Sequence, residues 1–332
     1  MLLSHLAEAK ARLSVFADTL YFGGGTPSLL GGKRIAEIVT VAKQNFGLDN
    51  AEITIEANPT EHLYEDFKLM ANAGVNRLSI GMQSCLENEL KALSRRHTAE
   101  DVVRTVEDAK KTGISNISVD VMLGIPHQTL DTLKQSLDFC LNLGITHISC
   151  YMLKIEPDTK FGHADINALD LPDEDTVADM YLFMSDYLEE NGFEHYEISN
   201  FAKKGFRAVH NLKYWEQKEY LGLGPAAHSF LNGKRFYFER DLQKYLSSPT
   251  PVFDSQGGSK DEYIMLKLRL KDGINFKEYE NLFGQPFTEK ATKIIERFQK
   301  FGLINTFDDG FSLTKQGFLV SNTIISEIIE NL

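Results

Sequence analysis

Short apolar runs alternate with longer helical patterns along the first half of the chain, and this alternation restricts the folds open to it. The apolar runs indicate strands at Leu20–Phe22, Ile53–Ala57, Arg77–Gly81, Ile117–Met122 and His147–Leu153. The helical patterns lie between them, at about Lys33–Phe46, Glu61–Ala73, Asp101–Lys111 and Leu130–Leu143. Strands joined through helices run parallel, because the helix carries the chain back to the edge where the preceding strand began. The order therefore predicts an α/β fold, either an open parallel sheet or a barrel.

Capping signals support several of these helices. Thr98 and Asp101 have the spacing of an N-cap residue and its partner. Gly74, Gly113 and Gly144 stand where helical patterns stop. Glycine readily adopts the left-handed conformation that ends a helix. We therefore expect helix ends at these three glycines.

Residues suited to binding a ligand lie at or just beyond the C-terminal ends of four successive strands, namely Gly24–Thr26, Glu56, Gln83 and Asp120. The carboxyl ends of parallel strands meet at one edge, where ligands bind in barrels and open sheets alike. In "YFGGGTP" three consecutive glycines also leave backbone N–H groups unshielded by side chains. We expect one shared pocket; the alternative for any single one of these residues is a helix cap or a loop hydrogen bond.

The alternation loosens after Leu153. Asp173–Asn191 predicts a long amphipathic helix ended by Gly192, and "FEHYEIS" predicts a further strand. Prolines and glycines between residues 247 and 259 indicate a linker. Residues 260–332 contain helical patterns around a hairpin with an Asp-Asp-Gly turn, which is typical of a winged-helix-like α+β domain.

Charge and composition exclude several functional classes. The formal net charge is −12, and residues 260–332 carry ten basic and eleven acidic side chains, so the basic surface of a general nucleic-acid binder is missing. No apolar run has the length of a membrane span. The first twenty residues lack the pattern of a signal peptide, which favours a cytoplasmic location. Cys85, Cys140 and Cys150 are too few and too scattered for a disulfide framework.

A series of motifs resembles one family from about Leu20 to the C-terminus. They are "YFGGGTPSLL", "ITIEANP", "GVNRLSIGMQS", "LSRRHTAEDV", "ISVDVMLGIPHQT", "HISCYMLKIEPDT", "HNLKYW" and "GLGPAAHSF". Together they resemble the HemW heme chaperones, which are radical S-adenosylmethionine proteins related to oxygen-independent coproporphyrinogen III oxidase. The resemblance implies a partial (β/α) barrel core at residues 1–160, an extension at 161–246, the linker at 247–259 and the winged-helix-like domain at 260–332.

The family pattern also implies a set of S-adenosylmethionine contacts. They are Gly24, Gly25, Thr26, Glu56, Gln83, Arg95 and Asp120. The chemistry is suitable, because carboxylates accept hydrogen bonds from ribose hydroxyls and an arginine pairs with the methionyl carboxylate. Without the resemblance, Arg95 would be taken for a solvated arginine at a helix end.

The family's iron–sulfur motif does not occur in this sequence. Radical chemistry in the family depends on a [4Fe–4S] cluster held by C-x3-C-x2-C, and the three cysteines here are not spaced in that way. We therefore expect no radical chemistry from the chain as given, no metal ligands and a barrel without its first strand. Two explanations stay open: Met1 is internal to a longer gene, or the protein has lost its cluster.

The segment "HNLKYW" carries the heme hypothesis. In the family it is proposed to bind heme, and imidazole is a suitable iron ligand, so His210 is the candidate, ahead of His228 and His195. A packing role for a histidine among aromatic residues is the alternative.

Three functions remain open from the sequence. The chain is a heme chaperone that passes heme to an unidentified acceptor, a coproporphyrinogen oxidase-like enzyme, or a cofactor-binding remnant without turnover. The first is favoured because "HNLKYW" is intact.

Overall fold

A curved seven-stranded sheet organises most of the chain. The computed structural model describes residues 6, 9, 16–59, 63–159, 161–165 and 168–332. Five parallel strands come first: β1 (Ala17–Phe22), β2 (Gly47–Ala57), β3 (Arg77–Gln83), β4 (Asn116–Leu123) and β5 (His147–Met152). The antiparallel strands β7 (Asn200–Ala202) and β6 (Glu194–Glu197) complete the order β1-β2-β3-β4-β5-β7-β6. The predicted α/β partial barrel is confirmed, and "FEHYEIS" forms β6 of a hairpin.

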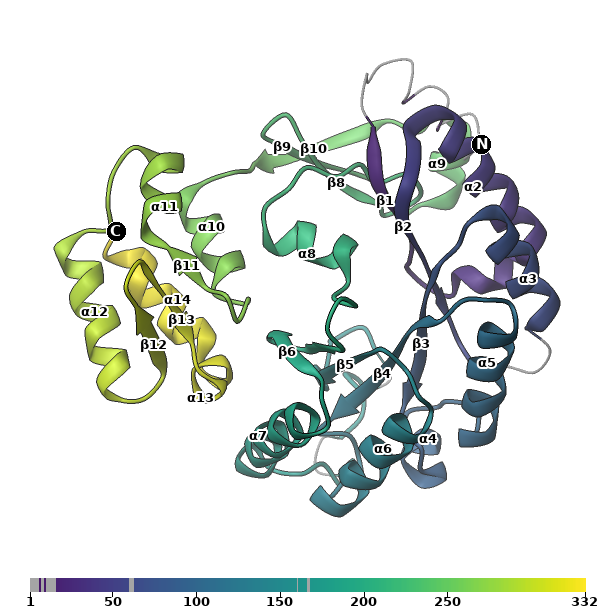
Figure 1. The fold of residues 1–332 in the computed structure, drawn as a ribbon, viewed down its shortest axis with the longest axis horizontal. Helices are drawn as coiled ribbons and strands as arrows, with labels where there is room; N and C mark the ends of the chain where they lie inside the picture. Colours follow the sequence, from purple (N-terminus) through teal and green to yellow (C-terminus); the bar gives the residue numbers. More distant parts are fainter. Residues whose placement is uncertain (1–5, 7–8, 10–15, 60–62, 160, 166–167) are drawn as a thin grey trace.

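Helices cover the outer side of the curved sheet (Figure 1). They are α2 (Gly32–Phe46), α3 (Tyr64–Ala73), α4 (Glu87–Ala92), α5 (Ala99–Lys111), α6 (Leu130–Asn142) and α7 (Glu174–Glu190), with a short 3-10 helix η1 (Pro27–Leu30) after β1. The four helices expected from the sequence are all present. No helix of the described residues is long and apolar enough to cross a bilayer.

The capping signals have the predicted outcome. Thr98 and Asp101 form a reciprocal capping box at the start of α5. Gly74 ends α3 in the left-handed conformation, with φ 114°, and Gly113 and Gly144 follow α5 and α6 with positive φ. These local contacts fix where each connection turns back toward the sheet.

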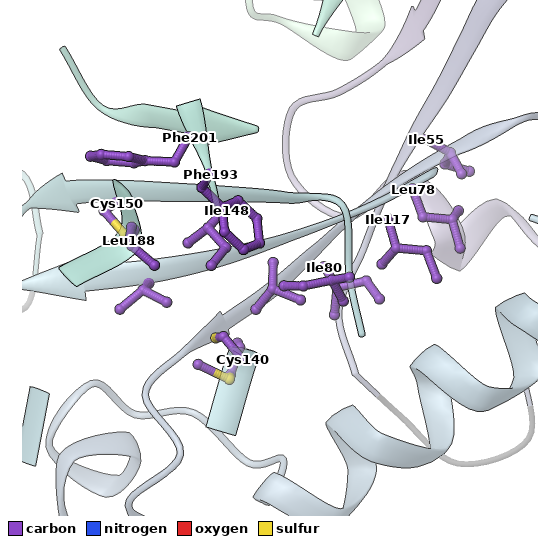
Figure 2. Close-up of a cluster of buried hydrophobic side chains, with 14 of the residues drawn as sticks. Ile55, Leu78, Ile80, Ile117, Cys140, Ile148, Cys150, Leu188, Phe193 and Phe201 are labelled. Atoms are coloured by element: carbon purple, nitrogen blue, oxygen red, sulfur yellow. The ribbon is translucent and has the colours of Figure 1, made fainter. Parts of the chain in front are cut away.

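Each parallel strand separates apolar from polar side chains with a period of two. The helix-facing positions include Ile55 on β2, Leu78 and Ile80 on β3, and Ile117 on β4, which cluster beneath the helices (Figure 2). The alternate positions carry polar groups such as Ser79, which bonds across to the next strand. Adjacent side chains of a strand point to opposite faces, so the curvature encloses a polar interior.

The second half of the chain adds two small sheets. A helix, α8 (Val209–Trp215), lies on the concave side of the large sheet (Figure 1), and the strands β8 (His228–Leu231), β9 (Lys234–Phe238) and β10 (Pro251–Gln256) with α9 (Leu242–Ser247) follow it. The segment 247–259, expected to be a linker, contains β10, which pairs with β9. Pro251 favours irregular chain in the sequence, but β10 is an edge strand, and an edge strand tolerates proline at its start. The domain boundaries themselves stay a prediction.

The C-terminal region has the expected winged-helix-like pattern. It contains α10 (Lys260–Lys267), α11 (Phe276–Phe283), α12 (Glu289–Lys300), α13 (Lys315–Leu319) and α14 (Ser321–Glu330). The strands β12 (Ile304–Phe307) and β13 (Gly310–Leu313) form the hairpin at the predicted Asp-Asp-Gly turn, and β11 (Ile274–Asn275) pairs with β13.

We expect Leu137→Ala to lower the free energy of unfolding by about 2–5 kcal/mol, because this side chain of α6 is fully buried beneath the sheet. Leu130→Ala is the matched control, since Leu130 is 41% exposed on the same helix. Urea unfolding at equilibrium measures both. Equal losses in the two variants would contradict the assignment of the core.

Candidate cofactor-binding site

The carboxyl ends of β2, β3 and β4 open into a cavity of about 320 Å³, which we call the glycine-turn cavity because Gly25 and Thr26 line it. Six of the seven residues predicted to hold S-adenosylmethionine line it, namely Gly25, Thr26, Glu56, Gln83, Arg95 and Asp120. The seventh, Gly24, contacts the carboxylate of Glu56. The structure thus brings together residues that lie up to 96 positions apart in the sequence.

The glycine turn after β1 is held in place by Glu56. Gly24 and Gly25 are exposed with φ of 83° and 67°, a conformation that residues with a Cβ rarely adopt. The N–H of Gly24 donates to Oε2 of Glu56 at 3.1 Å, and the hydroxyl of Tyr21 donates to Oε1 at 2.7 Å. Both carboxylate oxygens therefore have a partner inside the protein, and each retains lone pairs for a ligand.

Gln83 has an uncommon backbone conformation. Its φ is 71°, and the pairing of β3 with β4 shifts register between Ile80 and Gln83. A bulge of this kind redirects a side chain at a sheet edge. Tyr151 donates to the amide oxygen of Gln83 at 3.1 Å, which fixes the side chain in the cavity wall.

Asp120 is the second carboxylate of the cavity. The hydroxyl of Ser79 donates to it at 3.2 Å. Burial raises the pKa of Asp120 to about 6, against the opposing effects of hydrogen bonds from Ser149 and Ser79 and the charge of Arg77. The group is therefore mostly ionised at pH 7, at a cost in desolvation.

The sequence interpretation missed several residues of the cavity wall. They are Ala57, Asn58, Ser79, Gly81 and Tyr151. Asn58 donates to the hydroxyl of Thr26 at 2.9 Å and so joins the glycine turn to β2. The period of two was the available signal, because Ser79 and Gly81 share a face with Gln83 and Asn58 lies two residues after Glu56.

The cysteines do not fit an iron–sulfur cluster. Cys140 and Cys150 are fully buried between the sheet and its helices (Figure 2), and burial raises the pKa of both thiols. Cys85 lies against the hydroxyl of Ser136. Within the part of the chain that the structure describes, no three His, Cys, Asp or Glu side chains gather in a group suited to a metal ion. These cysteines therefore supply no set of ligands for a [4Fe–4S] cluster.

His210 lies in a second cavity, of about 260 Å³, beside β1. Leucines form much of its wall, including Leu20, Leu221 and Leu223, and Lys213 lines it as well. Nδ1 of His210 is 2.8 Å from the hydroxyl of Thr19, and Nε2 is 2.8 Å from the hydroxyl of Tyr214.

The imidazole of His210 is neutral at physiological pH. Burial lowers its pKa to about 4, helped by the charges of Lys213 and Arg77. The ring also stacks on Tyr21, with centroids 4.9 Å apart. Since Tyr21 also donates to Glu56, it contacts both His210 and a residue that lines the glycine-turn cavity.

The reserve histidines are placed differently. His195 is buried and stacks on Phe201 with centroids 4.2 Å apart, which is a packing arrangement. His228 stacks on Tyr237 with centroids 5.2 Å apart on the small sheet. His210 is thus the one of the three that lines the apolar cavity beside β1.

We expect Asp120→Asn to stabilise the protein by about 1–3 kcal/mol at pH 7.5. The raised pKa means that the folded state binds this proton more tightly than the unfolded state, so the wild type loses stability as the pH rises from about 4 to about 6. The gain should vanish below pH 4. Thermal unfolding across pH measures it, with the exposed Asp158→Asn as control; a gain independent of pH would contradict the raised pKa.

Comparison with known proteins agrees with this architecture. Residues 4–140 match the radical SAM superfamily, and residues 261–320 match the HemN C-terminal domain. The solved structure of coproporphyrinogen III oxidase (HemN) from Escherichia coli shares the fold, with a TM-score of 0.82 over 100% of this chain and 82% of that chain, at 20% identity.

Curated relatives match along nearly the whole chain. The heme chaperone HemW of Lactococcus lactis is 33% identical over 319 residues, which cover 94% of this chain and 84% of that protein. The Bacillus subtilis HemW is 32% identical, over 95% of this chain and 86% of that protein. The bovine mitochondrial radical S-adenosyl methionine domain-containing protein 1 is 39% identical, over 95% of this chain and 76% of that protein. The chain therefore belongs to the HemW family of radical SAM proteins.

Proposed function

We propose that this protein is a heme chaperone, which binds heme through the cavity beside β1 and passes it to an acceptor protein. The observation that carries the proposal is the position of His210 in a mostly apolar cavity wall that includes several leucines. Heme iron is commonly held by an imidazole within apolar surroundings. The curated relatives named HemW support the same function.

The state of His210 suits an iron ligand. A neutral imidazole offers a lone pair, and the lowered pKa keeps the ring neutral well below pH 7. Both ring nitrogens are hydrogen-bonded, so ligation through Nε2 requires the hydroxyl of Tyr214 to move away. Tyr214 is 38% exposed, and this side chain has room to do so.

We expect the protein to bind hemin stoichiometrically and His210→Ala to shift or abolish the Soret band, because the imidazole supplies an axial ligand. Absorbance titration measures both. His127→Ala is the control, since His127 bonds Asp170 on the exposed surface and lies outside the cavity. Identical spectra for the wild type and His210→Ala would remove His210 as the ligand.

The glycine-turn cavity is proposed to bind S-adenosylmethionine. The radical SAM superfamily implies this molecule, together with a [4Fe–4S] cluster whose ligands the described residues do not supply. Glu56 and Asp120 offer carboxylate oxygens for ribose hydroxyls, and Arg95 supplies the cation for the methionyl carboxylate. The exposed glycine backbone allows close approach of the ligand.

We expect Glu56→Ala to weaken S-adenosylmethionine binding by about tenfold or more, because it removes an acceptor and the anchor of the Gly24 turn. Isothermal titration calorimetry measures the affinity. Hemin uptake should be retained in the same variant. The matched control is Glu87→Ala on the exposed start of α4. Failure of the wild type to bind S-adenosylmethionine would refute this use of the cavity.

The other functions stay as alternatives. A coproporphyrinogen oxidase-like reaction needs the cluster, and the likeness to HemN establishes the fold alone. A turnover-free cofactor-binding protein would bind S-adenosylmethionine but not hemin, so the two titrations separate it from the chaperone. The cytoplasmic location inferred from the sequence stays a prediction.

A further inference from the structure

Two neighbouring side chains on the inner face of the sheet are buried without hydrogen-bond partners. Thr54 on β2 and Arg77 on β3 are paired in register, and their exposed fractions are 0% and 1%. Among the residues that the structure describes, Oγ1 of Thr54 and both Nε and Nη1 of Arg77 lack a partner. Arg77 begins the polar face of β3 that continues through Ser79 into the glycine-turn cavity.

A histidine further along the same sheet has hydrogen-bond partners for both ring nitrogens. His147 on β5 has the hydroxyl of Ser118 at 2.7 Å from Nδ1 and that of Tyr196 at 2.8 Å from Nε2. The hydroxyl of Tyr196 in turn accepts from the N–H of Ala208 at 3.3 Å. The same interior thus contains hydrogen-bonded polar side chains, and Thr54 and Arg77 are not part of that network.

The guanidinium of Arg77 is costly in this position. A buried charge without a counter-ion typically costs several kcal/mol, and proteins normally pair it. The carboxylates on this face of β2 and β4 have other hydrogen-bond partners: Glu52 with the N–H groups of Val209 and His210, Glu56 with Tyr21 and Gly24, and Asp120 with Ser79. An unpaired cation beside an unpaired hydroxyl has the chemistry that recognises one oxyanion.

The helix α8 covers this part of the interior through polar contacts. None of its seven residues, all of them described, is buried. The carboxylate of Glu52 accepts from the N–H groups of Val209 and His210 at 3.0 Å and 2.9 Å, and Lys213 pairs with Asp18 at 2.7 Å. These contacts are exposed or only partly buried, and with the stacking of His210 on Tyr21 they hold α8 less firmly than close apolar packing would.

We propose that Thr54 and Arg77 bind a carboxylate group of the ligand that His210 binds, so that they form an anion site beneath α8. The inference rests on the proposed function, because heme carries two propionate groups. His210 belongs to α8, and its backbone N–H donates to Glu52, which lies two residues before Thr54 on the same face of β2, so the two sites are neighbours. Lys213 is an unsuitable alternative anchor, since Asp18 already neutralises it.

The acid groups of the ligand provide the test. We expect the wild type to bind hemin and metal-free protoporphyrin IX at least about tenfold more tightly than their dimethyl esters, measured by fluorescence quenching and absorbance. Arg77→Gln should abolish this preference, because it should lower the affinity for the free acids and leave the affinity for the esters unchanged. Arg77→Lys should retain part of it, because the charge is preserved. Arg207→Gln, which alters an exposed ion pair with Glu194 and Asp272, should retain all of it.

The possible results separate the two proposals. Hemin binding through His210 without any preference for the free acids over the dimethyl esters would overturn the anion site alone. If Arg77→Gln loses the preference for the free acids while His210→Ala leaves the Soret band unchanged, the anion site stands and ligation of the iron by His210 is overturned. If Arg77→Gln weakens S-adenosylmethionine binding and leaves porphyrin binding unchanged, Arg77 would be assigned to the methionyl carboxylate, and the propionate site would be overturned. Absence of all porphyrin binding would overturn both.

Stability distinguishes a binding residue from a structural one. In the ligand-free protein, Arg77→Met should not lower the melting temperature, because it removes an unpaired buried charge. A fall of more than about 5 °C would show that Arg77 supports the fold and would overturn the proposal. Thr54→Val, which keeps the shape of the side chain, should reduce the preference for acids and provides the test should Arg77→Gln fail to fold.

Discussion

The separation of apolar from polar side chains along each parallel strand is the constraint on which the rest of this structure depends. Because the period is two, Leu78 and Ile80 pack beneath the helices while Arg77, Ser79 and Gln83 face the interior of the curved sheet. A one-residue slip would exchange the two faces and bury charges against the helices. Register therefore fixes both stability and the position of every interior polar group.

The interior that results is a connected polar surface and not an apolar core. Tyr21 stacks on His210 and donates to Glu56, which in turn holds the glycine turn through Gly24. Tyr21 thus contacts Glu56, which lines the glycine-turn cavity, and His210, which lines the cavity beside β1. A ligand that moves His210 disturbs the ring that orients Glu56, which gives the two proposed binding events a direct physical route to influence each other.

Local and long-range interactions contribute differently to the same site. Gly24 and Gly25 adopt left-handed conformations for intrinsic reasons, and the capping box of Thr98 and Asp101 is equally local. The start of α8, in contrast, depends on Glu52, which lies 157 residues earlier and accepts from the N–H of Val209. The glycine turn and the capping box can be predicted from neighbouring residues, whereas nothing in the sequence near Val209 indicates its contact with Glu52.

The strand–helix order, the helix ends, the family and six residues of the cavity wall could be predicted from the sequence, because they follow from periodicity, capping chemistry and contiguous motifs. Long-range packing, in contrast, places β10 in the expected linker, brings Tyr21 against both Glu56 and His210, and buries Thr54 and Arg77 together without hydrogen-bond partners. Those features arise from strand register and from packing between distant segments. Spacing along a single chain does not encode which polar atoms remain unpaired once the sheet has curved around them.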